Sequence, residues 1–346
     1  MKAGHKRFLI IRMSAIGDII LTTPVVRQLR QLYPDARIDY MVRPEYASLL
    51  QAHPDISQLL LYDTSREKGQ RKRWRKHIAE TQYDAILDLH ANLRSRLLCN
   101  GQKAPVYRFQ KHLLKRALLV RTGINLYPDS PQQLSVPGRY LEAAKELGLN
   151  PADRQLSLVL PEADRRWAEQ QWGSLRRHHI GVVMAPGARH FTKRWPPHYY
   201  AELVHMLADQ LGQNTLMLGG PEELSLIGEI RARCGTDILF SMVGEITLSQ
   251  TLALIEKAPI FVSNDSGLMH AAAAFEIPQV ALFGSTVREL GFFPVNPRAT
   301  VMEVEELSCR PCSHIGRDKC PKGHFDCMNE LHPAAVFSKI RQMETF

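Results

Sequence analysis

Short apolar runs alternate with stretches of helical periodicity along most of the chain. Residues 7–12 form an apolar run that ends in the loop Ser14–Asp18, and apolar side chains then recur at helical spacing from Ile19 to Leu29. This order of strand, loop and helix repeats, and it predicts further strands at residues 37–42, 59–62, 84–89, 180–184, 214–218, 260–262 and 279–282. Strands that alternate with helices are typical of parallel, doubly wound sheets, so we expect an α/β fold.

The length and the two series of strands predict two domains. The chain has 346 residues, which is about twice the ~150 residues usual for one domain. We expect an N-terminal domain at residues 1–165, a C-terminal domain at residues 178–332 and a C-terminal helix at residues 333–346. The charged stretch at residues 151–177, which includes a polar helix expected at residues 162–177, would join the two domains.

The composition is that of a globular protein that folds in water. Hydrophobic residues make up 45% of the chain and charged residues 23%, which excludes the disordered and coiled-coil classes. Arg12 and Asp18 interrupt the early apolar run too soon for a signal peptide or a membrane span. The six cysteines, two of them isolated, do not form the pattern of a secreted disulfide framework. We therefore expect a cytoplasmic protein.

Positive charge is concentrated in one stretch of the chain. Residues 66–121 contain 15 Lys and Arg but only four Asp and Glu, so the net charge of this stretch exceeds the +9 of the whole chain. The stretch could meet nucleic acid, an anionic membrane surface or a phosphorylated substrate. Alternatively, it is a solvated helix face without a partner.

Three segments of small and polar residues follow predicted strands. They are Ser14–Asp18 (SAIGD), Ala185–Ala188 (APGA) and Ser263–Gly267 (SNDSG). In open α/β sheets, ligands bind beyond the carboxyl ends of the strands, where the N–H groups of helix N-termini suit phosphate. None of the three segments is a GxGxxG or Walker A loop, which disfavours the usual dinucleotide and P-loop chemistries.

The segment Asn264–His270 (NDSGLMH) allows two interpretations. Asp265 or Ser266 could be the N-cap of the Ala-rich helix that follows. Alternatively, the backbone N–H groups of Ser266 and Gly267, with His270 one turn further along, could bind a diphosphate.

A second segment, Thr192–Pro196 (TKRWP), carries two adjacent cations between the APGA loop and a predicted helix at residues 199–211. Lys193 and Arg194 could neutralise a leaving group, whereas Trp195 is consistent with ordinary packing. Together with the preceding motif, the pair of cations favours an anion site.

Four motifs in register resemble the ADP-heptose:lipopolysaccharide heptosyltransferases of glycosyltransferase family 9. They are the segments 14–24 (SAIGDIILTTP), 186–188 (PGA), 193–196 (KRWP) and 264–270 (NDSGLMH). Their order and spacing match from about Phe8 to the end of the chain. The resemblance implies a GT-B fold, in which two Rossmann-like domains face each other across a cleft. It also implies that the N-terminal domain binds the acceptor and the C-terminal domain the nucleotide sugar.

The resemblance assigns roles residue by residue and implies an inverting transfer of heptose from ADP-heptose to a lipopolysaccharide inner-core acceptor, with no cofactor needed for catalysis. Asp18 matches the catalytic base, which would take the proton of the acceptor hydroxyl. Positions that bind the donor match Ala188, Thr192, Lys193, Asp265, Ser266, Gly267, Leu268 and His270. Three other activities are alternatives: transfer to a protein hydroxyl of an autotransporter, nucleic-acid binding, and sugar-nucleotide epimerisation.

The resemblance implies a role for the basic stretch at residues 66–121. An acceptor domain carrying Arg71, Arg73 and Arg94 would attract the phosphates and carboxylates of a lipopolysaccharide core. The same charges would bring the enzyme into peripheral contact with the cytoplasmic face of the inner membrane. No nucleic-acid partner is expected, because no recognised nucleic-acid motif accompanies the basic residues.

Four cysteines near the C-terminus are not explained by the common pattern of these transferases. Cys309, Cys312, Cys320 and Cys327 lie within 19 residues, a spacing that could hold a structural zinc or iron. His314 or His324 could replace one of the thiols. Because the spacing is not a standard zinc pattern, reduced or paired cysteines are the alternative.

Overall fold

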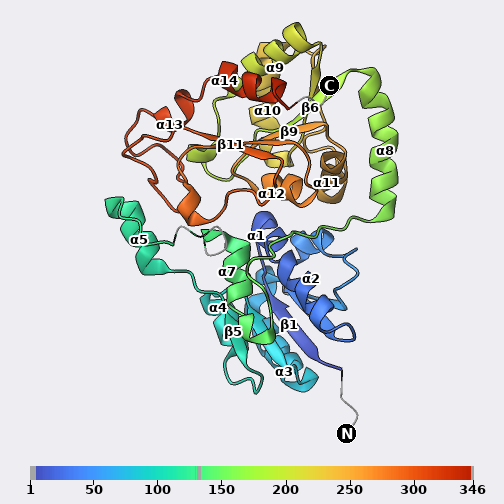
Figure 1. Ribbon diagram of the computed structural model, residues 1–346. Helices are drawn as coiled ribbons and strands as arrows, with labels where there is room; N and C mark the ends of the chain where they lie inside the picture. The colour runs from blue at the N-terminus through green and yellow to red at the C-terminus, as the bar shows by residue number, and fades with distance from the viewer. Residues whose placement is uncertain (1–4, 129, 131–133, 344–346) are drawn as a thin grey trace. The chain divides into compact units, whose positions relative to one another are not determined.

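The computed structural model describes residues 5–128, 130 and 134–343 (Figure 1). The chain divides into two compact units. The first unit is Met1–Leu113 with Pro128–Val159, and the second is Leu114–Tyr127 with Leu160–Phe346. Each unit contains one parallel sheet, so the α/β prediction is confirmed.

The sheet of the first unit has five strands in the order β3-β2-β1-β4-β5. All neighbouring strands are parallel, and Phe8 of the central strand lies opposite Ile38 and Ala85. This order, in which the chain starts in the middle and winds outward twice, is that of a doubly wound sheet. The strands are β1 (Arg7–Ile11), β2 (Arg37–Val42), β3 (Gln58–Leu61), β4 (Ala85–Asp88) and β5 (Val106–Arg108).

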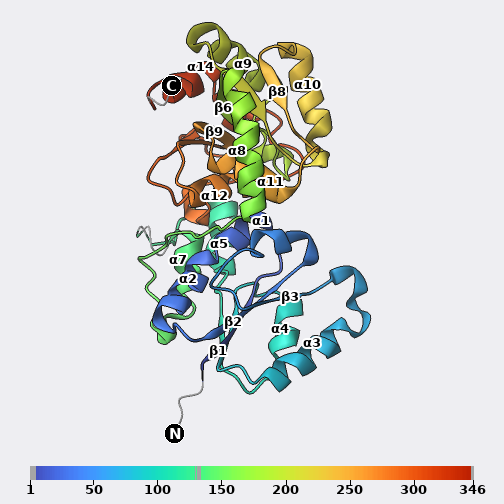
Figure 2. The same cartoon turned by 90° about the vertical axis from the view of Figure 1, so that its right-hand side faces the viewer.

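Helices cover both faces of this sheet. The α-helices are α1 (Ile16–Ile20), α2 (Thr23–Leu32), α3 (Glu67–Thr81), α4 (Leu93–Cys99) and α7 (Val136–Glu142). Short 3-10 helices occupy Pro44–Leu49, Thr64–Arg66 and Lys145–Leu147. Helix α3 packs on α4 and α2 packs on α7, and Figure 2 shows the two pairs on opposite faces of the sheet.

The sheet of the second unit has six parallel strands in the order β11-β10-β9-β6-β7-β8. They are β6 (Ile180–Ala185), β7 (Asn214–Met217), β8 (Leu239–Ser241), β9 (Ile260–Asn264), β10 (Gln279–Phe283) and β11 (Ala299–Glu303). The central strands β6, β9 and β10 are buried along their whole length. Such near-continuous apolar runs are expected where helices cover both faces of a parallel sheet.

The α-helices of the second unit are α5 (Leu113–Thr122), α8 (Glu162–Arg177), α9 (Pro197–Leu211), α10 (Leu224–Cys234), α11 (Leu248–Glu256), α12 (Gly267–Ala274), α13 (Asp326–Asn329) and α14 (Pro333–Arg341). Trp195 and Tyr200, both fully buried, lie in a core to which α9, α10, α13 and α14 contribute. Three 3-10 helices occupy Phe191–Lys193, Pro221–Glu223 and Arg288–Leu290. Over the described ranges, no helix has the length and apolar character needed to cross a membrane.

Both helices that the sequence placed outside the domains pack in the second unit. Helix α8 lies on α11, where the buried indole of Trp172 donates to the carbonyl of Leu254 at 3.2 Å. Helix α14 lies on α9 and buries Val336, Phe337 and Ile340 in the same core. Residues 1–4 and 344–346, at the two ends of the expected organisation, lie outside the described residues.

Three strands were missing from the sequence prediction, and all three are at sheet edges. Strands β5, β8 and β11 have only one neighbour each, and every residue of β5 and β11 is half-buried. An edge strand of three to five residues with mixed burial lacks the apolar run that marks a central strand.

Gly284, which follows β10, provides a test of the packing in the second unit. A Cβ at this position would lie 2.7 Å from Met328 Cε and 2.9 Å from the carbonyl oxygen of Thr192. Because backbone cannot give way as a side chain can, Gly284→Ala should lower the free energy of unfolding by about 1–3 kcal/mol. The midpoint of denaturant unfolding measures this change.

Gly173 in helix α8 is the matched control, because a Cβ there would have no heavy atom within 4 Å. Gly173→Ala should leave stability unchanged or raise it by about 0.5–1 kcal/mol, since alanine suits a helix interior better than glycine. If Gly284→Ala were as stable as the wild type, the close approach of Thr192 would be wrong.

Candidate active site

The three segments of small and polar residues (SAIGD, APGA and SNDSG) lie where the sequence predicted, at the carboxyl ends of central strands. Residues 14–18 follow β1, residues 186–188 follow β6 and residues 265–267 follow β9. The first motif belongs to the first unit and the other two to the second unit, so the motifs form two groups of residues.

In the first unit, Asp18 is held by a buried arginine. Asp18 is the third residue of α1, and its Oδ2 lies 2.6 Å from Nη2 of Arg12. The other nitrogens of Arg12 donate to the carbonyl oxygens of Ser14 at 2.8 Å and Leu89 at 2.9 Å. The guanidinium is therefore fixed by three partners, and it fixes one oxygen of the carboxylate.

A buried tyrosine completes this group. The hydroxyl of Tyr140 donates to Oδ1 of Asp18 at 3.5 Å, and the guanidinium of Arg12 lies 5.8 Å from the centre of the Tyr140 ring. Burial raises the pKa of Tyr140, so its hydroxyl remains a donor. Burial lowers the pKa of Arg12, but the opposing effects of Asp18, Tyr140 and Tyr40 together raise it above its ordinary value. The side chain of Asp18 is still 27% exposed, so a ligand hydroxyl can reach the carboxylate.

His90 is a second titratable group close to Asp18, and the sequence analysis did not identify it. Burial and the positive charges of Arg12 and Lys111 lower the pKa of His90 to about 4, against the opposing effect of Asp88 and Asp18. Its imidazole is therefore neutral at physiological pH.

In the second unit, Lys193 and Asp265 form an ion pair that is almost fully buried. Lys193 Nζ lies 2.6 Å from Asp265 Oδ2, and the two side chains are 14% and 5% exposed. The hydroxyl of Thr286 donates to the same oxygen at 2.7 Å. The pair brings together two residues that the sequence assigned to the donor, and Thr286 is an addition to them.

Asn264 connects the three segments around this ion pair. Its side-chain amide donates to the carbonyl of Pro186 at 2.7 Å, and its Oδ1 accepts the backbone N–H of Trp195 at 3.1 Å. The PGA loop, the KRWP segment and the start of the NDSG segment are thereby joined at one buried side chain. Ala188 of the first of these loops is buried and accepts from Arg194 at 2.7 Å.

Ser266, and not Asp265, is the N-cap residue of α12, so the N-cap interpretation holds for its position. Ser266 has the backbone conformation of an N-cap, but its side chain makes no capping hydrogen bond, and the carboxylate of Asp265 is held by Lys193 and Thr286. Within the described residues, the buried hydroxyl of Ser266 has no hydrogen-bond partner, and neither have those of Ser263 and Ser285. The N-terminus of α12 thus presents backbone N–H groups and the free hydroxyl of Ser266, which suits an anion.

The remaining donor-site candidates lie along the same helix and on the segment beside it. Gly267 and Leu268 are the first two residues of α12, and His270 is buried one turn further along. Thr192 is buried and exchanges two hydrogen bonds with Arg317: Thr192 N donates to the carbonyl at 3.0 Å, and Arg317 N donates to Thr192 Oγ1 at 2.8 Å.

Arg310 is a buried positioning residue that the sequence analysis missed. It donates to the carbonyl oxygens of Gly284 at 2.6 Å and Thr286 at 2.8 Å, bonds the carbonyl of Val304, and pairs with Glu303 at 2.5 Å. Arg310 thus fastens the cysteine segment to the backbone of the threonine that contacts Asp265.

The structure does not support the metal hypothesis for the four cysteines, Cys309, Cys312, Cys320 and Cys327. All four are free thiols, and burial raises the pKa of Cys312 and raises that of Cys327 to about 12. Among the residues with described positions, no group of three or more His, Cys, Asp or Glu is arranged to hold a metal ion. His324, considered as a replacement ligand, pairs instead with Asp326 at 2.8 Å.

The candidates for acceptor binding lie on neighbouring helices of the first unit. Arg71 and Arg73 are exposed on α3, and Arg94 is half-buried on α4. Trp74, between the cations of α3, is buried and donates to Gln70 at 3.1 Å, so its role is packing.

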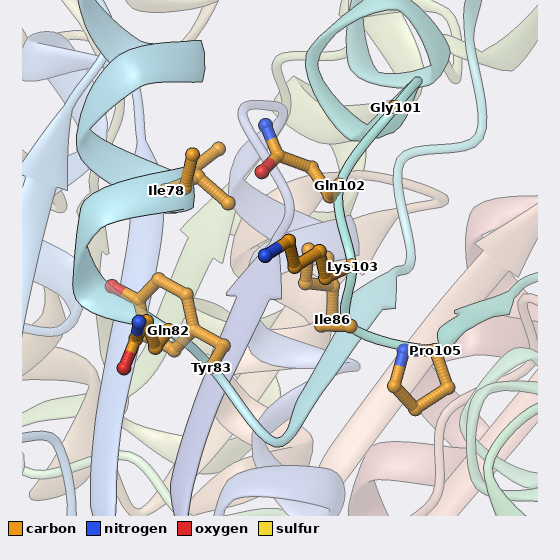
Figure 3. A pocket seen from close by; sticks show the side chains of 10 residues that line it. Ile78, Gln82, Tyr83, Ile86, Gly101, Gln102, Lys103 and Pro105 are labelled. Carbon is orange, nitrogen blue, oxygen red and sulfur yellow. The ribbon is translucent and has the colours of Figure 1, made fainter.

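A cavity of about 380 Å³ in the first unit lies away from the motif residues (Figure 3). Ile78 and Tyr83, near the end of α3, line one side of it, and residues 101–105 line the other. These residues precede β4 and β5, so the cavity is at the amino ends of the strands, whereas Asp18 follows the carboxyl end of β1. The cavity is therefore not part of the candidate site.

The known proteins that are similar to this chain belong to one family. The family model described as glycosyltransferase family 9 (heptosyltransferase) matches residues 71–321. Lipopolysaccharide heptosyltransferase 2 of Escherichia coli K12 is 29% identical over 351 residues, covering 97% of this chain and 98% of that protein. Lipooligosaccharide heptosyltransferase 2 of Haemophilus ducreyi is 30% identical over 359 residues, covering 97% and 99%.

A solved structure agrees with the sequence comparison. The structure of E. coli ADP-heptose lipopolysaccharide heptosyltransferase II matches with a TM-score of 0.76 at 25% identity, covering 97% of this chain and 98% of that one. The resemblance and the GT-B class inferred from the four motifs are confirmed. The chain is a glycosyltransferase and belongs to glycosyltransferase family 9, the heptosyltransferases.

Proposed function

We propose that this enzyme transfers heptose from ADP-heptose to the inner core of lipopolysaccharide, with inversion at the anomeric carbon. The observation that carries the proposal is the match over 97% of the chain to lipopolysaccharide and lipooligosaccharide heptosyltransferases. Lipid-linked acceptors in those names favour a lipopolysaccharide acceptor over a protein hydroxyl. We propose no nucleic-acid partner and no cofactor in the reaction.

The second unit supplies the donor site in this proposal. Lys193 and the N-terminus of α12 place positive potential where the diphosphate of ADP would bind and leave. Lys193 has three N–H donors and shares one with Asp265, so it can bind phosphate without losing that partner. The free hydroxyl of Ser266 can donate to the same group, and Ala188, Thr192, Gly267, Leu268 and His270 complete the proposed site.

Asp18 is the proposed general base. As the acceptor hydroxyl attacks the anomeric carbon, its proton passes to the carboxylate, and the bond to the ADP oxygen breaks on the opposite side of the sugar. Arg12 orients the carboxylate through Oδ2, which leaves Oδ1 near the weaker contact with Tyr140. Oδ1 is therefore the oxygen that can take the proton.

The basic stretch is proposed to recognise the acceptor. Exposed Arg71 and Arg73, with Arg94, would attract the anionic inner core, and the same charges would favour peripheral contact with the cytoplasmic face of the inner membrane. The proposed location of the enzyme is accordingly cytoplasmic.

The first experiment measures transfer by the purified enzyme. With ADP-heptose and an inner-core acceptor that lacks heptose, the wild type should release ADP and extend the acceptor by one heptose. Asp18→Asn should lower kcat by about 10² to 10⁴, because the amide cannot accept the proton. Its affinity for ADP should be unchanged, since Asp18 and the donor residues belong to separate groups.

His90→Gln is the control for this substitution, because it removes the neutral imidazole near Asp18, which is the other group that could accept a proton. It should keep more than about a tenth of the wild-type kcat. If His90→Gln lowered kcat by about 10² to 10⁴ and Asp18→Asn kept more than about a tenth of it, the assignment of Asp18 as the general base would be wrong. Labelling of a polypeptide in place of the core would overturn the proposed acceptor.

A second prediction concerns the donor site. Lys193→Ala should weaken ADP binding by about 10- to 100-fold, the range expected when a hydrogen-bonded charge contact is lost. Lys257→Ala is the control, because Lys257 also pairs with a carboxylate in the second unit, Glu169 at 3.6 Å, but lies outside the motifs. Equal ADP affinity in both variants, measured by calorimetry, would place the nucleotide elsewhere.

A third prediction concerns the basic stretch. Changing Arg71 and Arg73 together to Gln should raise the KM for the acceptor, leave that for ADP-heptose unchanged, and reduce the salt dependence of the acceptor KM. Arg166→Gln, which removes a 74% exposed arginine of the second unit, should change neither KM. An unaltered acceptor KM in the double variant would make the exposed face of α3 a solvated surface only.

A further inference from the structure

Helix α5 and the segment after it expose apolar side chains to an unusual degree. Leu113, Leu114, Ile124 and Leu126 are 59%, 87%, 52% and 53% exposed. The described part of the chain has ten large hydrophobic side chains in this exposed class, and four of them fall within these 14 residues. Such a concentration marks an interaction surface, since single exposed leucines are otherwise scattered.

Helix α5 is apolar on both sides, and one of these sides is exposed. Leu113, Leu114 and Ala117 are exposed, whereas Leu119 on the other side of the helix is buried. Positions 113, 114 and 117 lie on one face of an α-helix, and Arg121 continues that face one turn further. A helix on the surface of a soluble protein normally presents a polar side to water.

The charges around this face have a single sign. Residues 89–128 contain eight Lys and Arg and no Asp or Glu, and Lys115, Arg116 and Arg121 belong to α5 itself. In the second unit, Arg116 is near enough to His314 to lower its pKa, after the larger effect of burial, and the next residue, Ile315, is 48% exposed. Apolar side chains beside cations are the features by which interfacial helices bind anionic lipid.

We propose that α5 and residues 123–126 form a membrane-docking surface that inserts its leucines and isoleucine among the headgroups of an anionic bilayer. Figure 1 shows α5 with an extended segment at each end. The cations would contact lipid phosphates while the apolar side chains enter the acyl boundary. Because the proposed acceptor is a lipid, the contact would keep the enzyme on the surface that carries its substrate, and in this respect the surface rests on the proposed function.

Insertion differs from attraction by the basic stretch alone in its dependence on salt. Surface charges lose influence as ionic strength rises, but the burial of apolar side chains does not. Binding through α5 should therefore retain a component that high salt does not remove, and this component should depend on the leucines.

The test uses the full-length enzyme and vesicles of phosphatidylglycerol and phosphatidylethanolamine, with phosphatidylcholine vesicles for comparison. The wild type should co-sediment with the anionic vesicles. Changing Leu113 and Leu114 together to Ser should weaken this binding by about tenfold, because two partly inserted leucines together contribute on the order of one tenfold step. Changing Lys115, Arg116 and Arg121 to Gln should weaken binding at low salt but not at high salt.

Leu224→Ser is the matched control. Leu224 is 54% exposed at the start of α10 but follows two glutamates, so its loss should not change vesicle binding. Leu114→Trp adds a direct readout, since its fluorescence should shift to the blue on anionic vesicles and not on phosphatidylcholine.

Three outcomes would overturn the proposal. The first is vesicle binding by the double serine variant equal to that of the wild type, and the second is an unshifted spectrum for Leu114→Trp. The third is a dimer in solution that the serine variant dissociates, because the face would then be covered by a second copy of the chain.

Activity separates this proposal from the function on which it rests. The double serine variant should lose transfer to an acceptor embedded in vesicles but keep transfer to a water-soluble acceptor freed of its acyl chains. Vesicle binding without transfer to either acceptor, in the wild type, would contradict the proposed function and leave the docking surface intact.

Discussion

The carboxylate of Asp265 is the constraint around which the second unit is organised. It lies almost fully out of water at the end of β9, and a buried charge is tolerated only with a cation and hydrogen bonds around it. Lys193 and Thr286 provide them from segments after two other strands, so the loops beyond β6, β9 and β10 must meet at this point. The neighbouring Asn264 adds the neutral bonds that keep the same loops together.

The first unit uses the same principle with the charges reversed. There the cation, Arg12, is the buried partner at the end of a central strand, and the carboxylate of Asp18 is left partly exposed. The two ion pairs therefore present groups of opposite charge to a ligand. In the first unit this group is a carboxylate that can accept a proton, and in the second unit it is an ammonium group beside a helix N-terminus. The proposed transfer between a hydroxyl and a nucleotide diphosphate would use both.

The sequence predicted the central strands, the helices Glu162–Arg177 and Leu248–Glu256, and the three motifs, because each has a local signal: an apolar run, a helical period or a cluster of small residues after a strand. It did not predict Arg12, Tyr140, Thr286 or Arg310. Tyr140 is 122 residues from Asp18, and a single polar residue so distant carries no mark of its partner. The cysteines show that a close spacing in the sequence can also mislead. The four thiols lie within 19 residues but are not arranged to hold a metal ion, because ligand geometry depends on how the backbone turns between them.

The hydrogen bonds between Thr192 and Arg317 have a consequence for synthesis of the protein on the ribosome. The two residues are 125 positions apart, so the segment that carries Lys193 leaves the ribosome well before the residue that holds it in place. Arg310, which fastens Thr286, also emerges late. A nascent chain that already contains every strand of the second sheet therefore lacks the hydrogen bonds that hold the segment with Lys193. A chain that ended after β11 would lack both these hydrogen bonds and the apolar side chains that α13 and α14 add to the core, so the last part of the chain supports the sheet and the Lys193 segment together.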